Sequence, residues 1–237
     1  RDCLLSRGLG DVYKRQVTLV GGSIADGYLA GVKSVVVPEN VTEPVSGQTY
    51  TVVATEGAFY GLEDIEDVSL PNTITSITYD FVELPNLVSL NLPESLVSLR
   101  RFDTLPKLTE LVFPESLQTI CDESFLYVGL KEVVLPASVT RLGYMVFSEM
   151  FNLERIEMPG MKHAGTYVLN DCTKLKKLVL PPCFSQNDLL SFSSDFEEVW
   201  FGSDGSDAEC MLSVTSFKCK PDAVSVSYTH LRAHETR

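Results

Sequence analysis

Apolar residues recur along this chain with a period near 22 residues. The pattern is clearest over 87–120, where the phrase L-x-x-L-x-Φ-P-E-S-L-x-x-Φ (Φ is apolar) begins at Leu87 and again at Leu108. Self-similarity at such a period predicts a solenoid, in which each repeat packs only against its neighbours.

The repeat extends in both directions when each copy is counted from its first apolar residue as position 1. Positions 1, 4 and 6 are apolar in eight copies, and proline occupies position 7 in seven of them. The steps between these prolines are 33, 22, 21, 22, 23 and 22 residues, and the eighth copy has Gly202 instead. The copies begin at Val32, Ile65, Leu87, Leu108, Leu130, Leu153, Leu175 and Phe196.

Positions 4 and 6 are two residues apart, which predicts a very short strand with alternate side chains inward. Proline lacks an N–H group for a strand ladder, so position 7 ends the strand. The small polar residue at position 9, such as Ser95 or Ser116, is expected to hydrogen-bond backbone groups freed at the turn.

Two further apolar ladders precede position 1 and predict a back wall. Three residues before it stand Leu62, Leu84, Leu105, Tyr127, Met150 and Cys172, and six before it stand Phe59, Phe81, Phe102, Ser124, Phe147 and Leu169. Phe125 lies next to the exception, Ser124, which indicates a one-residue shift in that turn. The predicted fold class is a repeat solenoid with short parallel strands on one face, irregular turns on the other and little helix.

The repeat resembles the BspA-type leucine-rich repeat of bacterial surface proteins, through L-x-x-L-x-L-P-x-S-L-x-x-I followed by F-x-x-C/L-x-x-L. The resemblance runs from Val32 to Phe201, and Gly47-x-x-Tyr50-x-Val52 with Gly57-Ala58-Phe59 is similar to the lead-in before the first full repeat. The copy at Leu153 departs from the pattern, with Gly160-Met161-Lys162 in place of P-x-S-L. The resemblance implies a leucine-rich-repeat fold, an extracellular or cell-surface location, and adhesion or host interaction.

Both ends of the chain fit no repeat. Residues 6–16 can be encoded by a DNA sequence whose reverse complement, read one base out of frame, encodes residues 226–235. This DNA sequence resembles the transposon-end adapter of shotgun sequencing libraries. We therefore expect 1–16 and 225–237 to be translated adapter, not native protein. The remaining segment is expected to be an interior stretch of a longer protein, with an N-terminal cap containing an outlying repeat and a hairpin at 17–58 and the solenoid at 59–224.

Composition narrows the function classes. The formal net charge is −13, which argues against nucleic acid, since its binding depends on Lys and Arg contacts with phosphate. No apolar run approaches the length of a membrane span, so no membrane insertion is expected within this fragment. The cysteines show no framework spacing; Cys172 is expected to be a small buried hydrophobe, and Cys210 with Cys219 could form a disulfide.

No catalytic residues, metal ligands or cofactors are predicted. His163 is the only histidine outside the two ends, and it has no partner motif nearby. The segment 204–209 lacks the spacing of a calcium loop, and no Cys/His pair has zinc spacing.

The outward side of the strand ladder, at positions 3 and 5, is the predicted ligand-binding face. One row is partly apolar and ends in the only tryptophan, and its neighbour is charged, as in a protein-binding surface with a polar rim. Valine also simply suits strands, which leaves a structural explanation open. The face comprises Glu110, Val112, Glu132, Val134, Arg155, Glu157, Lys177, Val179 and Trp200.

The function predicted from these observations is non-enzymatic binding of a protein or glycan ligand, possibly of host origin, through the strand face. The alternative is a structural spacer or stalk that presents a domain missing from this fragment.

Overall fold

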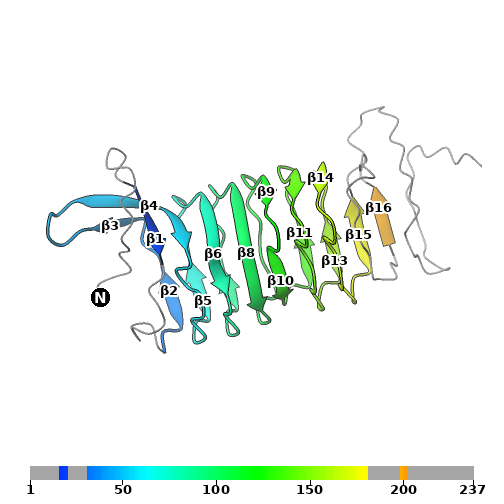
Figure 1. Cartoon of the computed structure of the whole chain (residues 1–237), viewed down its shortest axis with the longest axis horizontal. Coiled ribbons are helices and arrows are strands. Elements are labelled where there is room, and N and C mark those ends of the chain that lie inside the picture. Colours follow the sequence, from blue (N-terminus) through cyan, green and yellow to red (C-terminus); the bar gives the residue numbers. More distant parts are fainter. Residues whose placement is uncertain (1–15, 21–30, 181–197, 202–237) are drawn as a thin grey trace, which may run out of the picture.

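The chain forms an elongated stack of parallel strands, with no helix among the residues that the structure describes. The structure is a computed structural model. It describes residues 16–20, 31–180 and 198–201, the first and last of these ranges by their backbone alone. The strands follow one another along the long axis, from β1 to β4 at one end to β16 near the other (Figure 1). The predicted solenoid with parallel strands is confirmed.

The predicted strands at positions 3 to 5 form two parallel sheets on one side of the stack, here called the strand face. The first sheet has the order β2-β5-β7 and the second has the order β11-β13-β15-β16. Their bounds are β2 Ser34–Val36, β5 Asp67–Ser69, β7 Ser89–Leu90, β11 Glu132–Val134, β13 Arg155–Glu157, β15 Lys177–Leu180 and β16 Glu198–Phe201.

The opposite side, here called the second face, carries a nine-stranded sheet where irregular turns were expected. Its main path runs β1-β4-β6-β8-β9-β12-β14, and β3 and β10 pair with β4 and β8. Its strands are β1 Gln16–Val20, β3 Asn40–Thr42, β4 Thr49–Glu56, β6 Ser76–Val82, β8 Ser98–Leu105, β9 Thr119–Ile120, β10 Phe125–Val128, β12 Arg141–Leu142 and β14 His163–Ala164. Only β3 pairs antiparallel within this sheet, as a hairpin with β4 that extends from the N-terminal end (Figure 1).

The core lies between the two faces and follows the repeat. Five phenylalanines form a continuous column, with ring centroids 5.4, 5.0, 5.1 and 5.3 Å apart from one ring to the next. All five side chains are fully buried: Phe59, Phe81, Phe102, Phe125 and Phe147. Each rung thus covers the apolar surface of the next, as a solenoid requires.

The expected one-residue shift in the fifth rung is present. Phe125 pairs with Phe102 across the strands and takes the ring position, while the Ser124 hydroxyl donates to the Cys121 carbonyl at 2.6 Å. The shift also moves the other back-wall ladder. Tyr127, predicted to be part of that wall, is 46% exposed, and Val128 is buried in its place.

The polar residue at position 9 behaves as expected in two of the rungs. The Ser95 hydroxyl donates to the Ile74 carbonyl at 2.7 Å, and the Ser116 hydroxyl donates to the Leu96 carbonyl at 2.7 Å. The equivalent hydroxyls of Thr73 and Ser138 are buried without a hydrogen-bond partner. The turn therefore tolerates this residue type even where its hydrogen bond is not made.

The strand face is interrupted at the rung that begins at Leu108. Glu110, Leu111 and Val112 belong to no strand. The first sheet of this face therefore ends at β7, and the second sheet begins at β11. Leu111, predicted as a core residue, is only partly buried. On the second face the sheet is continuous across this rung, because β9 joins β8 to β12.

Gly160 explains why the sixth rung departs from the repeat motif. A Cβ atom at this position would lie 2.0 Å from the Ala137 carbonyl oxygen of the preceding rung. Met161 is buried beside it and supplies the apolar side chain that leucine or valine supplies in neighbouring rungs. The altered sequence therefore keeps the stack intact.

We expect Gly160→Ala to lower the free energy of unfolding by about 1–3 kcal/mol, because two rungs must move apart to admit the methyl group. Urea denaturation measures the loss, and the exposed substitution Thr166→Ala is the control, with an expected change within about 0.5 kcal/mol. Equal stability of the two variants would mean that the rungs are not in close contact here.

Candidate functional site

The predicted face places its charged row in register across three neighbouring strands. Glu132 pairs with Arg155, and Arg155 pairs with Lys177, through the parallel ladders of β11, β13 and β15. The Arg155 guanidinium also donates to the Glu157 carboxylate on the same strand. The row is therefore a mixed-charge surface, with Glu132 and Lys177 exposed on either side of this ion pair.

The apolar row at position 5 is shorter than predicted. Val112 is 84% exposed and Val134 is 51% exposed, and they are neighbours in the stack. Val134 pairs in turn with Glu157, which pairs with Val179, so a charged side chain interrupts the row. Only the two exposed valines form an apolar patch in this part of the face.

The remaining predicted site residues differ in how the structure places them. Glu110 and Val112 are both exposed, but they lie in the rung without a strand. Trp200 lies on β16, and its backbone pairs with Val179. Its side chain lies outside the described residues.

The described residues with potential catalytic or metal-binding chemistry stand in structural surroundings. His163 is exposed on β14. No group of three or more His, Cys, Asp or Glu residues within the described part could hold a metal ion. Cys172 is fully buried, as expected, and its thiol donates to the Phe147 carbonyl at 2.9 Å. Burial raises the pKa of this thiol to about 12, which keeps it protonated and unreactive.

Asp80 is the one fully buried carboxylate among the described residues. It accepts hydrogen bonds from the Thr55 hydroxyl at 2.8 Å, the Ala58 amide at 2.8 Å and the Thr78 amide at 3.0 Å. Burial raises its pKa to about 6, although these hydrogen bonds oppose the shift. Two of these donors belong to the preceding rung, so Asp80 holds two neighbouring rungs together.

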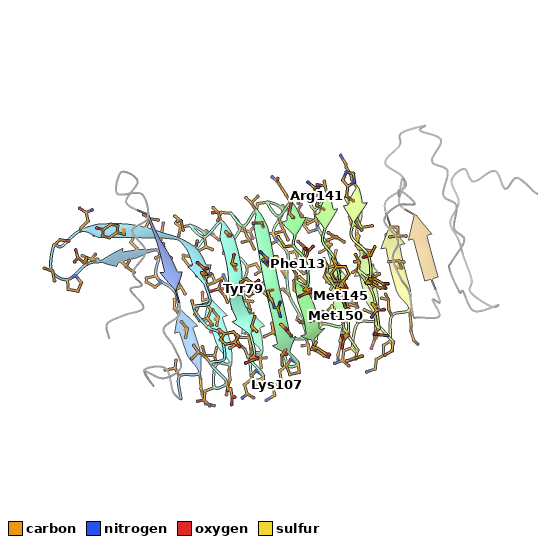
Figure 2. All side chains as sticks on the ribbon, in the orientation of Figure 1. Tyr79, Lys107, Phe113, Arg141, Met145 and Met150 are labelled. Atoms are coloured by element: carbon orange, nitrogen blue, oxygen red, sulfur yellow. The ribbon has the colours of Figure 1, made fainter. Side chains whose placement is uncertain are left out.

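The second face carries exposed aromatic side chains that were not predicted from the sequence. Tyr144 and Tyr167 are 41% and 46% exposed, and their ring centroids are 6.0 Å apart. Tyr79, on an earlier rung, lies under the guanidinium groups of Arg100 and Arg101, at 5.4 and 5.7 Å. Figure 2 shows Tyr79 and Met145 on different rungs of the stack, with Arg141 near its upper edge.

The second face has a left-handed backbone corner that recurs every 22 residues. Gly57 and five later residues share one corner of the rung and a positive φ between 51° and 61°: Tyr79, Arg101, Glu123, Met145 and Tyr167. Left-handed backbone is unfavourable for residues with a side chain, so the fold and not the residue type imposes this corner. Each of these corner residues stands seven or eight residues before position 1 of a copy of the repeat, so the corner can be located from the sequence.

The Arg101 side chain connects two of these corner positions by charge. Its guanidinium bonds the Glu123 carboxylate at 3.1 Å and lies 3.7 Å from the Asp103 carboxylate. Arg100 and Arg101 are thereby engaged with Tyr79 or with acids. By contrast, no cation covers Tyr144 or Tyr167 within the described chain.

A rung of about 22 residues, a short parallel strand ended by proline and a continuous apolar core together define a leucine-rich-repeat solenoid. The chain belongs to the BspA-type leucine-rich repeat family, whose model matches six copies over residues 53–103 and 97–199. Proteins of this family are bacterial surface proteins, for which protein-binding or structural roles are suggested, and the fold is typically non-enzymatic.

Solved structures support the same fold. The chain is similar to the leucine-rich repeat protein TpLRR of T. pallidum, with 25% identity, a TM-score of 0.61, and coverage of 83% of this chain and 84% of that one. It is also similar to a leucine-rich repeat protein from Bacteroides ovatus, with 24% identity, a TM-score of 0.57, and coverage of 72% of this chain and 48% of that one. No curated protein matches the sequence.

Among the described residues, no helix has the length and apolar character needed to cross a membrane.

Proposed function

We propose that this chain is a non-enzymatic protein-binding module of a bacterial surface or secreted protein, and that it contacts its partner through the strand face. Family membership supports the surface location and the binding role. The observation that carries the choice of face is the exposed pair Val112 and Val134, beside the charged row of Glu132, Arg155 and Lys177. Exposed apolar side chains within a charged surround are typical of a transient protein interface.

The solenoid also supports this use through its rigidity. Each rung is fixed to two neighbours by a buried phenylalanine column and by backbone ladders, so the outward side chains keep their spacing before a partner arrives. Preorganisation lowers the entropy cost of binding, which matters for a small patch.

The test is binding to a panel of purified secreted and extracellular-matrix proteins, measured by surface plasmon resonance. We expect Val134→Glu to weaken binding to a panel partner at least about tenfold, which corresponds to 1.4 kcal/mol, because it puts a charge at the centre of the patch. The matched control is Val97→Glu, which adds the same charge at a valine that is 41% exposed, next to β8 of the second face. Equal loss in both variants, or no loss in Val134→Glu, would show that the strand face is not the contact surface.

A spacer role is the second candidate, and the Bacteroides ovatus comparison favours it, since this chain spans about half of that longer repeat protein. A spacer would show no binding to any panel protein, and the full reading frame would place a separate domain beyond the repeats.

A further inference from the structure

The last described rungs of the second face bring basic side chains without ion pairs next to uncovered aromatic rings. Arg141 on β12 and His163 on β14 are paired residues of one parallel ladder, and both are exposed. Lys162 is exposed beside His163. None of these three side chains takes part in an ion pair within the described part of the chain.

The two exposed tyrosines follow on the same two rungs. Tyr144 lies three residues after Arg141, and Tyr167 lies four residues after His163. Three to four residues of extended chain span at most about 10 to 13 Å, so the basic row and the aromatic row border one strip of surface. Between the rows stand Gly143 and Gly165, which add no side chain to the strip.

The two unpaired cations of this strip, Arg141 and Lys162, outnumber the one acid that borders it. Asp122 is the acid nearest in position, and its carboxylate accepts the Tyr144 amide at 2.8 Å. Glu123 is bound by Arg101. Residues 100–180 hold ten lysines and arginines against ten acidic residues, whereas residues 31–99 hold only Lys33 against ten acidic residues. The acidic first rungs are distant: four strand spacings separate β4 from β12, about 19 Å, which exceeds the Debye length of about 8 Å at physiological ionic strength.

We propose that this strip, formed by Arg141, Lys162, His163, Tyr144 and Tyr167, binds an acidic polysaccharide whose sugar rings carry carboxylates. A uronic acid presents a carboxylate and an apolar C–H face on the same ring, so it meets both rows at once. The guanidinium and ammonium groups bind the carboxylate, and the tyrosine rings stack on the sugar. An aspartate or glutamate side chain offers the charge without the flat apolar face, so the paired rows favour a sugar over an acidic peptide.

This site is separate from the proposed protein-binding surface, since it lies on the opposite sheet. The test uses the whole chain and a six-residue oligogalacturonate, with calorimetric titration at low and at physiological ionic strength. We expect binding that weakens as salt rises, and no binding of maltohexaose, which has no carboxylates. The double variant Arg141→Gln, Lys162→Gln is expected to weaken binding about tenfold, and Tyr144→Ala with Tyr167→Ala is expected to weaken it similarly.

The control is Lys131→Gln, which removes an exposed cation next to β11 on the strand face and is expected to leave the affinity unchanged. All five substituted side chains are exposed, and a thermal melt verifies that each variant is folded. The proposal is overturned if oligogalacturonate does not bind, if maltohexaose binds equally well, or if Lys131→Gln weakens binding as much as the double variants. Equal binding of hexa-aspartate would also overturn it, because the surface would then recognise charge alone.

Discussion

Replacing Phe102 by alanine is expected to lower the free energy of unfolding by about 3–5 kcal/mol. Phe102 is fully buried in the phenylalanine column, between Phe81 at 5.0 Å and Phe125 at 5.1 Å. Removing this ring takes away its own buried surface and also one stacked face from each neighbour. In a linear stack no other element can move in to fill the space, so the cavity remains.

Urea denaturation measures this loss, and amide hydrogen exchange locates it. Protection should fall in the rungs on both sides of Phe102, since each rung depends on its neighbours. Phe151→Ala is the matched control, because it removes the same side chain where it is 46% exposed. A loss in Phe102→Ala no larger than in Phe151→Ala would mean that the column does not hold the solenoid together.

Stability is expected to fall between about pH 4 and pH 6 because of Asp80. In the unfolded chain this carboxyl titrates near its ordinary pKa of 3.8, whereas burial raises the pKa to about 6 in the folded chain. Between these values the folded state binds more protons than the unfolded state, so the free energy of unfolding decreases as the pH rises. The difference of about two pKa units corresponds to a contribution of about 3 kcal/mol to the free energy of unfolding. This contribution is present below pH 4 and is lost above pH 6.

Asp80→Asn isolates this contribution. The asparagine does not ionise, so the fall in stability between pH 4 and pH 6 should be smaller by about 3 kcal/mol than in the parent chain. At pH 4 the variant is expected to be less stable by about 1–3 kcal/mol, because its amide NH₂ faces a group that donates a hydrogen bond. Urea midpoints across this range provide the measurement, with the exposed Glu83→Gln as control. An unchanged pH profile in Asp80→Asn would exclude Asp80 as the cause.

The repeat could be predicted from the sequence because its physics is local. Apolar positions spaced by 22 residues, such as Phe59 and Phe81, must meet when the chain closes each rung, and proline must end each strand. The shift at Ser124 and Phe125 was visible for the same reason, since a phenylalanine stands one place away. Its effect on Tyr127 was missed because tyrosine suits both a buried wall and an exposed turn.

The second face could not be predicted because its strands contain left-handed corners. Arg101 and Thr104 both have positive φ within β8, so inward and outward side chains do not alternate there with a period of two. A periodicity argument therefore assigns turns where the structure has a sheet. The strip of Arg141, Lys162, His163, Tyr144 and Tyr167 was missed for this reason. The predicted strand face follows a strict alternation, and its rows were placed in the correct register from β11 to β15.

The interruption at Glu110 to Val112 has a mechanical consequence for the whole solenoid. Across this rung one face lacks a ladder of backbone hydrogen bonds, and the joint is held by the opposite sheet and the buried side chains. When the ends of the molecule are pulled apart, as by fluid flow, the rod is expected to bend open there first, with the intact sheet acting as its hinge.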